Sequence, residues 1–101
     1  MDIMNSKEAA MTVKSAANAL LQNFSITITP VEIVVLNSLI SYMDIFILKC
    51  FKNGKLKHTN WITARLTEVH ILLQVSKSKE IKTLLRIVDG LEKLILLEKN
   101  V

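Results

Sequence analysis

The stretch TPVEIVVLNSLISYMDIFILKC, residues 29–50, decides the fold. Thr29 can serve as an N-cap, Pro30 suits the first helical position, and Glu32 can return the hydrogen bond of a capping box. The residues that follow are apolar at almost every angle of a helix, and a helix with so little polar surface must be enclosed on several sides. The pattern therefore predicts a central helix over about 30–52. Its thin polar strip consists of Asn37, Ser41 and Asp44.

Three more helices are predicted around the central one, because only two Gly and one Pro interrupt the chain. Upstream, Asn5 and Glu8 have the spacing of a capping box, and alanines recur behind them at helical spacing, which permits close approach of a neighbouring helix. Downstream, a basic turn around Gly54 and a short break at 76–79 separate two further helices. The predicted helices run over about 6–23, 30–52, 59–75 and 78–98, with residues 24–29 as an extended connector.

A single domain is expected, because a chain of 101 residues is long enough for one hydrophobic core and too short for two. Short links between consecutive helices make them antiparallel neighbours. Half of the residues are apolar, a high share for this length, and three short neighbours cannot fully enclose the central helix. The sequence thus predicts an all-α fold over residues 1–101, a small antiparallel four-helix bundle that dimerisation completes.

Compartment and membrane topology are indicated by what is rare in the chain. Cys50 is the single cysteine, so an intramolecular disulfide is impossible and a reducing compartment fits best. The N-terminus has no basic region followed by an apolar run of the kind that a secretory signal needs, so an intracellular, cytoplasmic protein is expected. Residues 33–51 are apolar enough to suggest a membrane span. However, Asp44 near the middle costs about 2.5–3.5 kcal/mol on insertion, which favours a buried central helix instead.

Charge divides the chain into two halves of opposite sign. Residues 1–48 hold two lysines and four acids, whereas residues 49–101 hold eleven Lys or Arg and five acids. Basic charge gathered on one part of a small chain favours a polyanionic partner. Cations of the second half are therefore the candidates for contact with such a partner.

Four cations of the predicted fourth helix fall on one line. At 100° per residue they lie within an arc of about 60° and extend over about 21 Å of helix axis. Such a spacing lets several cations meet successive phosphates, and Gly90 on the same line would let a backbone approach closely. A solvated face is the alternative, since every amphipathic helix needs one. The four residues are Lys79, Lys82, Arg86 and Lys93.

The basic turn before the third helix supplies two more candidate phosphate contacts, Lys55 and Lys57. Lysines nearer the end of the central helix complement its dipole, whereas these two have no such structural role. The adjoining strip of the third helix carries neutral hydrogen-bonding groups suited to sugar or phosphate oxygens, or to water. That strip consists of Thr63, Thr67, His70 and Gln74. If the turn and the fourth-helix cations share a side of the molecule, they form one basic surface.

A candidate interface for a second copy or another protein occupies the apolar arc of the third helix, at Trp61, Arg65, Glu68 and Leu72. Arg65 and Glu68 are three residues apart and can pair. Trp and Arg are enriched at interface hot spots, which suggests an Arg65–Glu68 pair made across a two-fold axis. The alternative places both charges at the margin of the core, with the Arg65 stem along apolar surface and its head in water.

Catalytic chemistry has little basis in this sequence. His58 and His70 belong to different elements and have no cysteine or carboxylate at metal-ligand spacing. Cys50 lies on an apolar helix, which predicts an inert core thiol. Gly54 and Gly90 are isolated and form no phosphate-cradling loop. We expect no catalytic residue, no metal site, no cofactor and no small-molecule substrate, and hence a non-enzymatic protein.

Two functional hypotheses follow from these patterns. The first is a small helical homodimer that presents its basic face to the backbone of duplex RNA or DNA without base specificity. The single tryptophan and single tyrosine disfavour stacking on single strands. The second is a protein–protein interaction module, such as an adaptor, an inhibitor or an immunity-type protein, that uses the apolar central helix and the patch of Trp61, Arg65 and Glu68. In that case the basic residues only maintain solubility.

Overall fold

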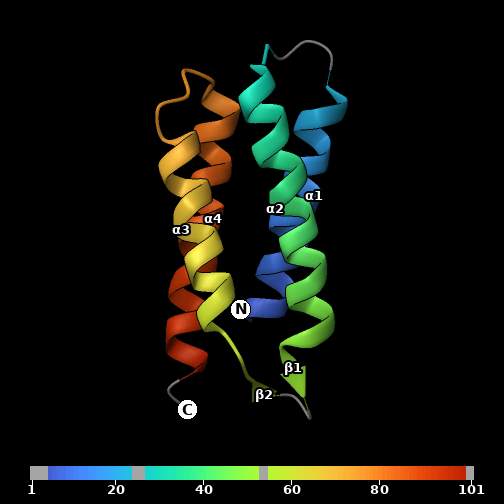
Figure 1. Ribbon diagram of the computed structural model, residues 1–101, viewed down its shortest axis with the longest axis vertical. Coiled ribbons are helices and arrows are strands. Elements are labelled where there is room, and N and C mark those ends of the chain that lie inside the picture. Colours follow the sequence, from blue (N-terminus) through green and yellow to red (C-terminus); the bar gives the residue numbers. More distant parts are fainter. Residues whose placement is uncertain (1–4, 24–26, 53–54, 100–101) are drawn as a thin grey trace, which may run out of the picture.

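Four helices make up most of the chain, which is all-α in class (Figure 1). The computed structural model describes residues 5–23, 27–52 and 55–99. The helices are α1 (Ser6–Gln22), α2 (Pro30–Lys49), α3 (Asn60–Leu73) and α4 (Lys79–Glu98). A short antiparallel hairpin of β1 (Phe51–Lys52) and β2 (Lys55–Leu56) joins α2 to α3. The prediction of an all-α fold with four helices is confirmed.

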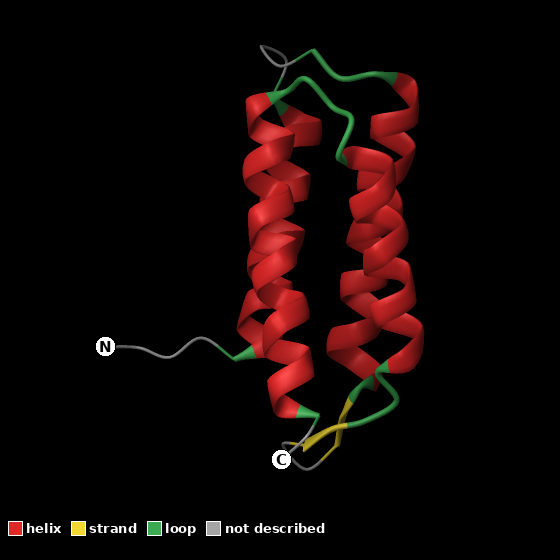
Figure 2. Cartoon of the chain, turned by 90° about the vertical axis from the view of Figure 1, so that its left-hand side faces the viewer, coloured by secondary structure: helices red, strands yellow, loops and turns green. Residues whose placement is uncertain are grey.

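The helices form an elongated bundle whose extents are 41 × 30 × 20 Å (Figures 1 and 2). α1 packs against α2 and α4, and α3 packs against the same two helices. The α1–α2 and α3–α4 connections lie at one end of the bundle, and the hairpin lies at the other (Figure 1). Because α1 and α3 each pack against both α2 and α4, the helices α2 and α4 occupy diagonal corners of the bundle, and their outer sides face away from each other.

Side chains cap the N-termini of α1, α2 and α4, whereas Thr59 before α3 makes no side-chain capping hydrogen bond. Thr29 Oγ1 accepts a hydrogen bond from the backbone N–H of Glu32 at 3.2 Å, and Glu32 Oε1 accepts one from the backbone N–H of Thr29 at 2.9 Å. The predicted capping box at the start of α2 is therefore confirmed. Asn5, which precedes α1, accepts a hydrogen bond from the backbone N–H of Glu8 through its side chain. Ser78, which precedes α4, accepts one from the backbone N–H of Ile81 in the same way.

The end of α2 differs from the prediction. The helix ends at Lys49 instead of residue 52, because the chain turns directly into the hairpin. Phe51 pairs with Leu56 across the hairpin, and the Phe51 ring lies edge-on to Phe46 with the ring centroids 5.2 Å apart. Packing of this aromatic ring against the core favours the hairpin over a further turn of helix.

Parts of two predicted elements lie outside the described residues. These are Gly54, the predicted centre of the basic turn, and residues 24–26 of the predicted connector. Residues 27–29 belong to neither helix nor strand. After the hairpin, His58 has a φ of 58°, a left-handed conformation that redirects the chain into α3.

Alanine side chains bring α1 close to its neighbours. Ala9, Ala10 and Ala17 are at most 2% exposed, and α1 packs against both α2 and α4 along its length. Hydrogen bonds also join the start of α1 to the end of α4. The Glu98 carboxylate accepts from the Ser6 backbone N–H at 2.7 Å and from Ser6 Oγ at 2.8 Å. Ser6 is fully buried, so this pair of hydrogen bonds locks α1 to α4.

The neighbouring helices enclose α2 incompletely, as the sequence predicted. Its buried residues form a single side of the helix, with Leu36, Leu39 and Phe46 fully enclosed. Val34 is 65% exposed and Leu48 is 78% exposed, so the neighbouring helices do not enclose α2 on several sides. A square arrangement gives each helix only two contacting neighbours, which is why one side stays open. By length and composition α2 could cross a membrane, a test that core helices of soluble proteins also pass.

Candidate functional site

The outer side of α4 carries the four cations on which the nucleic-acid hypothesis depends. We call Lys79, Lys82, Arg86 and Lys93 the α4 stripe. All four are exposed. The buried side of the same helix points into the core between α1 and α3, so the stripe lies on the side away from it. The buried residues of α4 are Ile81, Leu84, Leu85, Val88, Leu91 and Ile95.

The members of the α4 stripe differ in how much of their charge is neutralised. Lys93 Nζ lies 3.2 Å from Asp89 Oδ2, one helical turn earlier, and this pair is largely in solvent. Lys79, Lys82 and Arg86 have no ion pair within the described part of the chain. These three cations are therefore more available to an anionic partner than Lys93, and Lys82 and Arg86 lie nearest the centre of the stripe. Gly90, on the same side, has open space where a Cβ would stand.

The hairpin lysines lie at one end of the bundle. Lys55 and Lys57 are both exposed, and β2 packs against α4. Because the hairpin adjoins the C-terminal end of α4, it lies nearer to Lys93 than to Lys79 (Figure 1). The six predicted cations are thus spread along the length of the molecule instead of gathering into one cluster.

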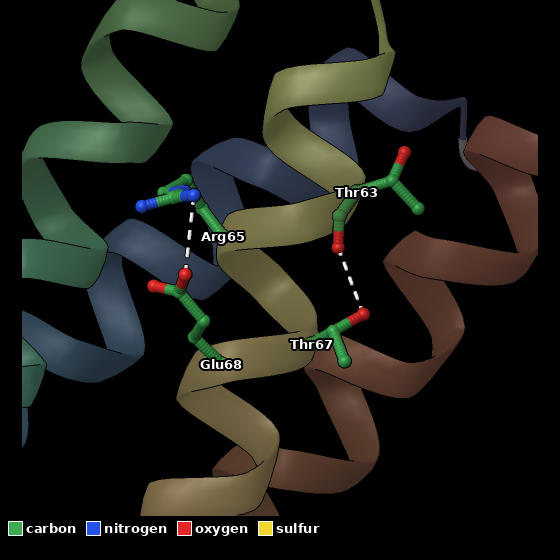
Figure 3. A network of polar contacts seen from close by, with 4 residues as sticks. All are labelled: Thr63, Arg65, Thr67 and Glu68. Atoms are coloured by element: carbon green, nitrogen blue, oxygen red, sulfur yellow. Dashed lines mark hydrogen bonds and ion pairs between the residues drawn. The ribbon is translucent and has the colours of Figure 1, made fainter.

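The hydroxyls of the predicted polar strip on α3 are already engaged within the helix. Thr63 Oγ1 donates to the Thr59 carbonyl at 2.7 Å, and Thr67 Oγ1 donates to the Thr63 carbonyl at 2.9 Å. Figure 3 shows both threonines on the α4 side of α3. Each hydroxyl proton already takes part in a hydrogen bond within the helix, so these groups are poorly suited to donate to a phosphate oxygen.

The four predicted interface residues lie along the edge of α3 that faces α2. Arg65 Nη2 lies 3.1 Å from Glu68 Oε1, which confirms that these residues can pair, and Figure 3 shows both side chains between α3 and α2. Each is about half exposed. Trp61 packs partly buried against the core, whereas Leu72 is 50% exposed. Because Arg65 and Glu68 pair within one helix, neither charge needs a second copy for neutralisation.

Cys50 is one of the residues that line a surface groove of about 490 Å³ between the end of α2 and the start of α3. The side chain is 1% exposed, and its Sγ lies 3.7 Å from the His58 carbonyl oxygen. Burial raises the pKa of the Cys50 thiol above its ordinary value, which keeps it protonated and weakly nucleophilic. This environment agrees with an inert core thiol.

The sequence predicted the apolar central helix as an assembly surface, and the structure shows which of its residues face outward. We call Val34, Asn37, Ser41, Ile45 and Leu48 the α2 ridge. They recur at intervals of three or four residues and so share one side of the helix. Asn37 and Ser41 mark this side as outward, and the apolar residues at the same helical angle must be exposed with them.

The residues that the structure describes do not form an evident metal site. No group of three or more His, Cys, Asp or Glu side chains is placed to hold an ion there. No protein-family model, curated protein or solved structure matches this chain.

Proposed function

We propose that this protein is a small non-enzymatic helical binding protein that acts as a homodimer. In this proposal the α4 stripe binds the backbone of duplex RNA or DNA without base specificity. One observation carries it: four exposed cations line the outer side of α4, and Lys82 and Arg86 at its centre have no acidic partner within the described residues. The setting would be the reducing cytoplasm, where Cys50 remains a thiol.

The spacing of the α4 stripe suits a polyphosphate. The stripe extends over about 21 Å of helix axis, so several phosphates of one strand can lie along it. Cations that contact only phosphates position a duplex without reading its sequence. Lys55 and Lys57 extend the positive potential at the Lys93 end and add electrostatic attraction.

The aromatic residues favour a duplex over a single strand. Stacking platforms for unpaired bases require exposed aromatic rings. Among the described residues, Phe46 is fully buried, and Tyr42, Phe51 and Trp61 are partly buried against the core. Contact through the sugar–phosphate backbone is therefore the mode that this surface supports best.

The experiment compares two charge-matched variants. The Lys82→Gln/Arg86→Gln variant removes two stripe cations, and the Lys7→Gln/Lys49→Gln control removes two exposed lysines from α1 and α2. Binding to a random duplex is measured by fluorescence anisotropy at several salt concentrations. The stripe variant should bind more weakly and should lower the slope of log K against log salt by about 2, because each phosphate contact contributes about 0.9.

Two results would contradict the nucleic-acid proposal. One is the absence of duplex binding by the wild type at low salt. The other is an equal loss in both variants, because net charge alone would then explain the attraction. Circular dichroism of each variant checks that the helices are intact.

The exposed α2 ridge favours a second candidate function. A protein–protein interaction module, such as an adaptor, an inhibitor or an immunity-type protein, would bury this ridge together with Trp61, Arg65 and Glu68 against another protein. Val34 and Leu48 are more than half exposed, and such residues in a contiguous group mark interaction sites. In that case the Lys82→Gln/Arg86→Gln variant should bind the partner protein as tightly as the wild type does.

A further inference from the structure

The α2 ridge is nearly symmetric about its central residue. Counted from Ser41, its members stand four positions away at Asn37 and Ile45, and seven positions away at Val34 and Leu48. If two such ridges pack antiparallel with Ser41 at the crossing point, Val34 of each copy meets Leu48 of the other. Asn37 then meets Ile45, and the small Ser41 lets the helix axes approach closely. The ridge is therefore complementary to itself, as a two-fold interface requires.

Charge makes a second copy the best-suited occupant of this face. The chain has a net charge of +4, so two copies that approach through the α4 stripe repel each other. The α2 ridge has no charged side chain. Of the charges that border it, Lys14 pairs with Asp44 across α1 and α2, and Arg65 pairs with Glu68 on α3. Lys49 beside Leu48 has no ion pair among the described residues, but an antiparallel register keeps the Lys49 side chains of the two copies at opposite ends of the contact.

Exposed apolar side chains agree with a missing partner. Val31, Val34 and Leu48 on α2 are all more than 60% exposed, and Leu72 and Val75 at the end of α3 and just after it are at least 50% exposed. Met11 on α1 and Leu96 and Leu97 on α4 are exposed to a similar degree, but the α2 ridge has no charged side chain.

We propose that the α2 ridge binds the same ridge of a second copy in antiparallel orientation, with Ser41 on the two-fold axis. This specifies the homodimer of the proposed function and does not depend on duplex binding. Because α2 and α4 occupy diagonal corners, the dimer directs its two α4 stripes in opposite directions (Figure 1). A dimer of this geometry presents two separate basic faces and can bridge two duplexes instead of clamping one.

A charge-swap experiment tests the register. Val34→Lys and Leu48→Glu each place a charge opposite an apolar residue of the other copy, so each should weaken dimerisation by at least about 100-fold. The double variant Val34→Lys/Leu48→Glu should restore the dimer, because every lysine then meets a glutamate of the other copy. The two positions stand about 21 Å apart within one helix and cannot pair in a monomer. Sedimentation equilibrium distinguishes a mass of 11.4 kDa from twice that value.

The outcomes separate this arrangement from its alternatives. A monomeric wild type, or a double variant that stays monomeric, overturns the proposal. A parallel pair of α2 helices or contact through another face also predicts no rescue, because opposite charges would not meet. Both positions are more than half exposed in the single chain, so each variant is expected to keep its helical circular dichroism. If the wild type is monomeric and binds phospholipid vesicles or another protein, and the ridge variants lose that binding, the ridge is assigned to that partner instead.

A cysteine at the axis provides an independent test. Ser41→Cys should form a disulfide-linked dimer on mild oxidation, because the two-fold axis brings the two residues to the same point. Thr83→Cys on the exposed side of α4 serves as the matched control and should remain largely uncrosslinked. The wild type controls for Cys50, which is buried. Equal crosslinking at both positions would overturn the assigned axis.

Bridging of two duplexes tests the opposite orientation of the stripes. An immobilised duplex saturated with wild-type protein should capture a second, labelled duplex, and Leu48→Glu should abolish the capture while retaining binding to one duplex. A dimer that binds no duplex contradicts only the proposed function. A monomer that binds duplex contradicts only the inference about α2. A dimer that binds one duplex without bridging overturns the opposed arrangement.

Discussion

The two helices at diagonal corners of the bundle differ in one respect that decides their roles. α2 and α4 are each 20 residues long, and each buries one side in the same core. The outer side of α2 has no charged residue along its ridge, whereas that of α4 carries four cations. The two helices thus pack in the same way, and only the chemistry of their outer sides distinguishes the proposed assembly surface on α2 from the proposed ligand surface on α4.

The largest effect is expected inside the core, on the side of α2 opposite the ridge. Phe46 is fully buried and contacts Phe51. Phe46→Ala should lower the free energy of unfolding by about 3–5 kcal/mol, because it removes buried apolar surface and leaves a cavity. Urea denaturation followed by circular dichroism measures the change.

Leu48→Ala is the matched control for the core prediction. Leu48 lies on the same helix but is 78% exposed, so in the single chain its truncation should change stability by no more than about 0.5 kcal/mol. If both substitutions cost the same at a concentration where the protein is monomeric, the assignment of an inner and an outer side to α2 is wrong.

Salt should separate the two outer faces. With about four phosphate contacts from the α4 stripe, or about six if Lys55 and Lys57 also take part, the affinity for a duplex should fall roughly 10²- to 10³-fold between 50 and 200 mM salt. Self-association through the uncharged α2 ridge should stay unchanged or strengthen over the same range, because apolar burial is not screened. Anisotropy and sedimentation measure the two equilibria. Parallel losses in both would show that one electrostatic surface serves both functions.

The capping box of α2 gives a pH-dependent effect of intermediate size. The hydrogen bond from the Thr29 backbone holds the pKa of Glu32 below its ordinary value, with a further contribution from Ser76. The stabilisation that the ionised Glu32 carboxylate provides is therefore complete above pH 4.5 and is lost as the pH falls through the lowered pKa. Glu32→Gln should cost about 1–2 kcal/mol at pH 7, and the difference from the wild type should vanish in acid. A pH-independent difference would exclude the ionised carboxylate as its source.

Gly90 offers a stabilising change on α4. It lies inside the helix, and no atom of a neighbouring segment lies within 4 Å of the point that a Cβ would occupy, so alanine meets no obstacle there. Gly90→Ala should raise the free energy of unfolding by about 0.5–1 kcal/mol, because alanine loses less backbone entropy on helix formation. Thermal denaturation measures the gain. Destabilisation instead would mean that the space beside α4 is occupied in solution.

The smallest effect is expected at Glu92 on α4. Burial raises the pKa of its carboxyl group, the His70 charge opposes that shift, and Asp89 adds to it. Its Oε1 atom is buried without a hydrogen bond among the described residues. Glu92→Gln should therefore stabilise the protein at neutral pH by less than about 1 kcal/mol, since solvent screens part of the penalty. The gain should disappear as the pH falls through the raised pKa, and a gain that persists in acid would contradict this cause.

Local signals account for the parts of the fold that sequence patterns predicted well. Thr29 and Glu32 mark the start of α2 because their hydrogen bonds join residues three positions apart, and Pro30 between them suits the first position of a helix. The end of α2 follows no such rule. It depends on Phe51 packing against the core and on pairing with Leu56, and contacts of that kind depend on how distant segments meet.

The candidate site shows the same division. The helical period alone places Lys79, Lys82, Arg86 and Lys93 on one line, and the structure finds all four exposed. The period does not reveal that Lys93 pairs with Asp89 while Lys82 and Arg86 stay unpaired within the described residues. It also does not place Lys55 and Lys57 at one end of the bundle, because their position depends on the packing of β2 against α4.

By itself, the sequence determined the all-α class, the caps and the cationic line of α4, because each depends on residues within a few positions of one another. Tertiary structure alone decided that α2 and α4 stand at diagonal corners and which side of α2 stays open. A square of four helices gives each member two neighbours, so every helix keeps an outer side whatever its composition. The apolar residues of α2 exceed what two neighbours can cover, and the excess forms the ridge that we assign to a second copy.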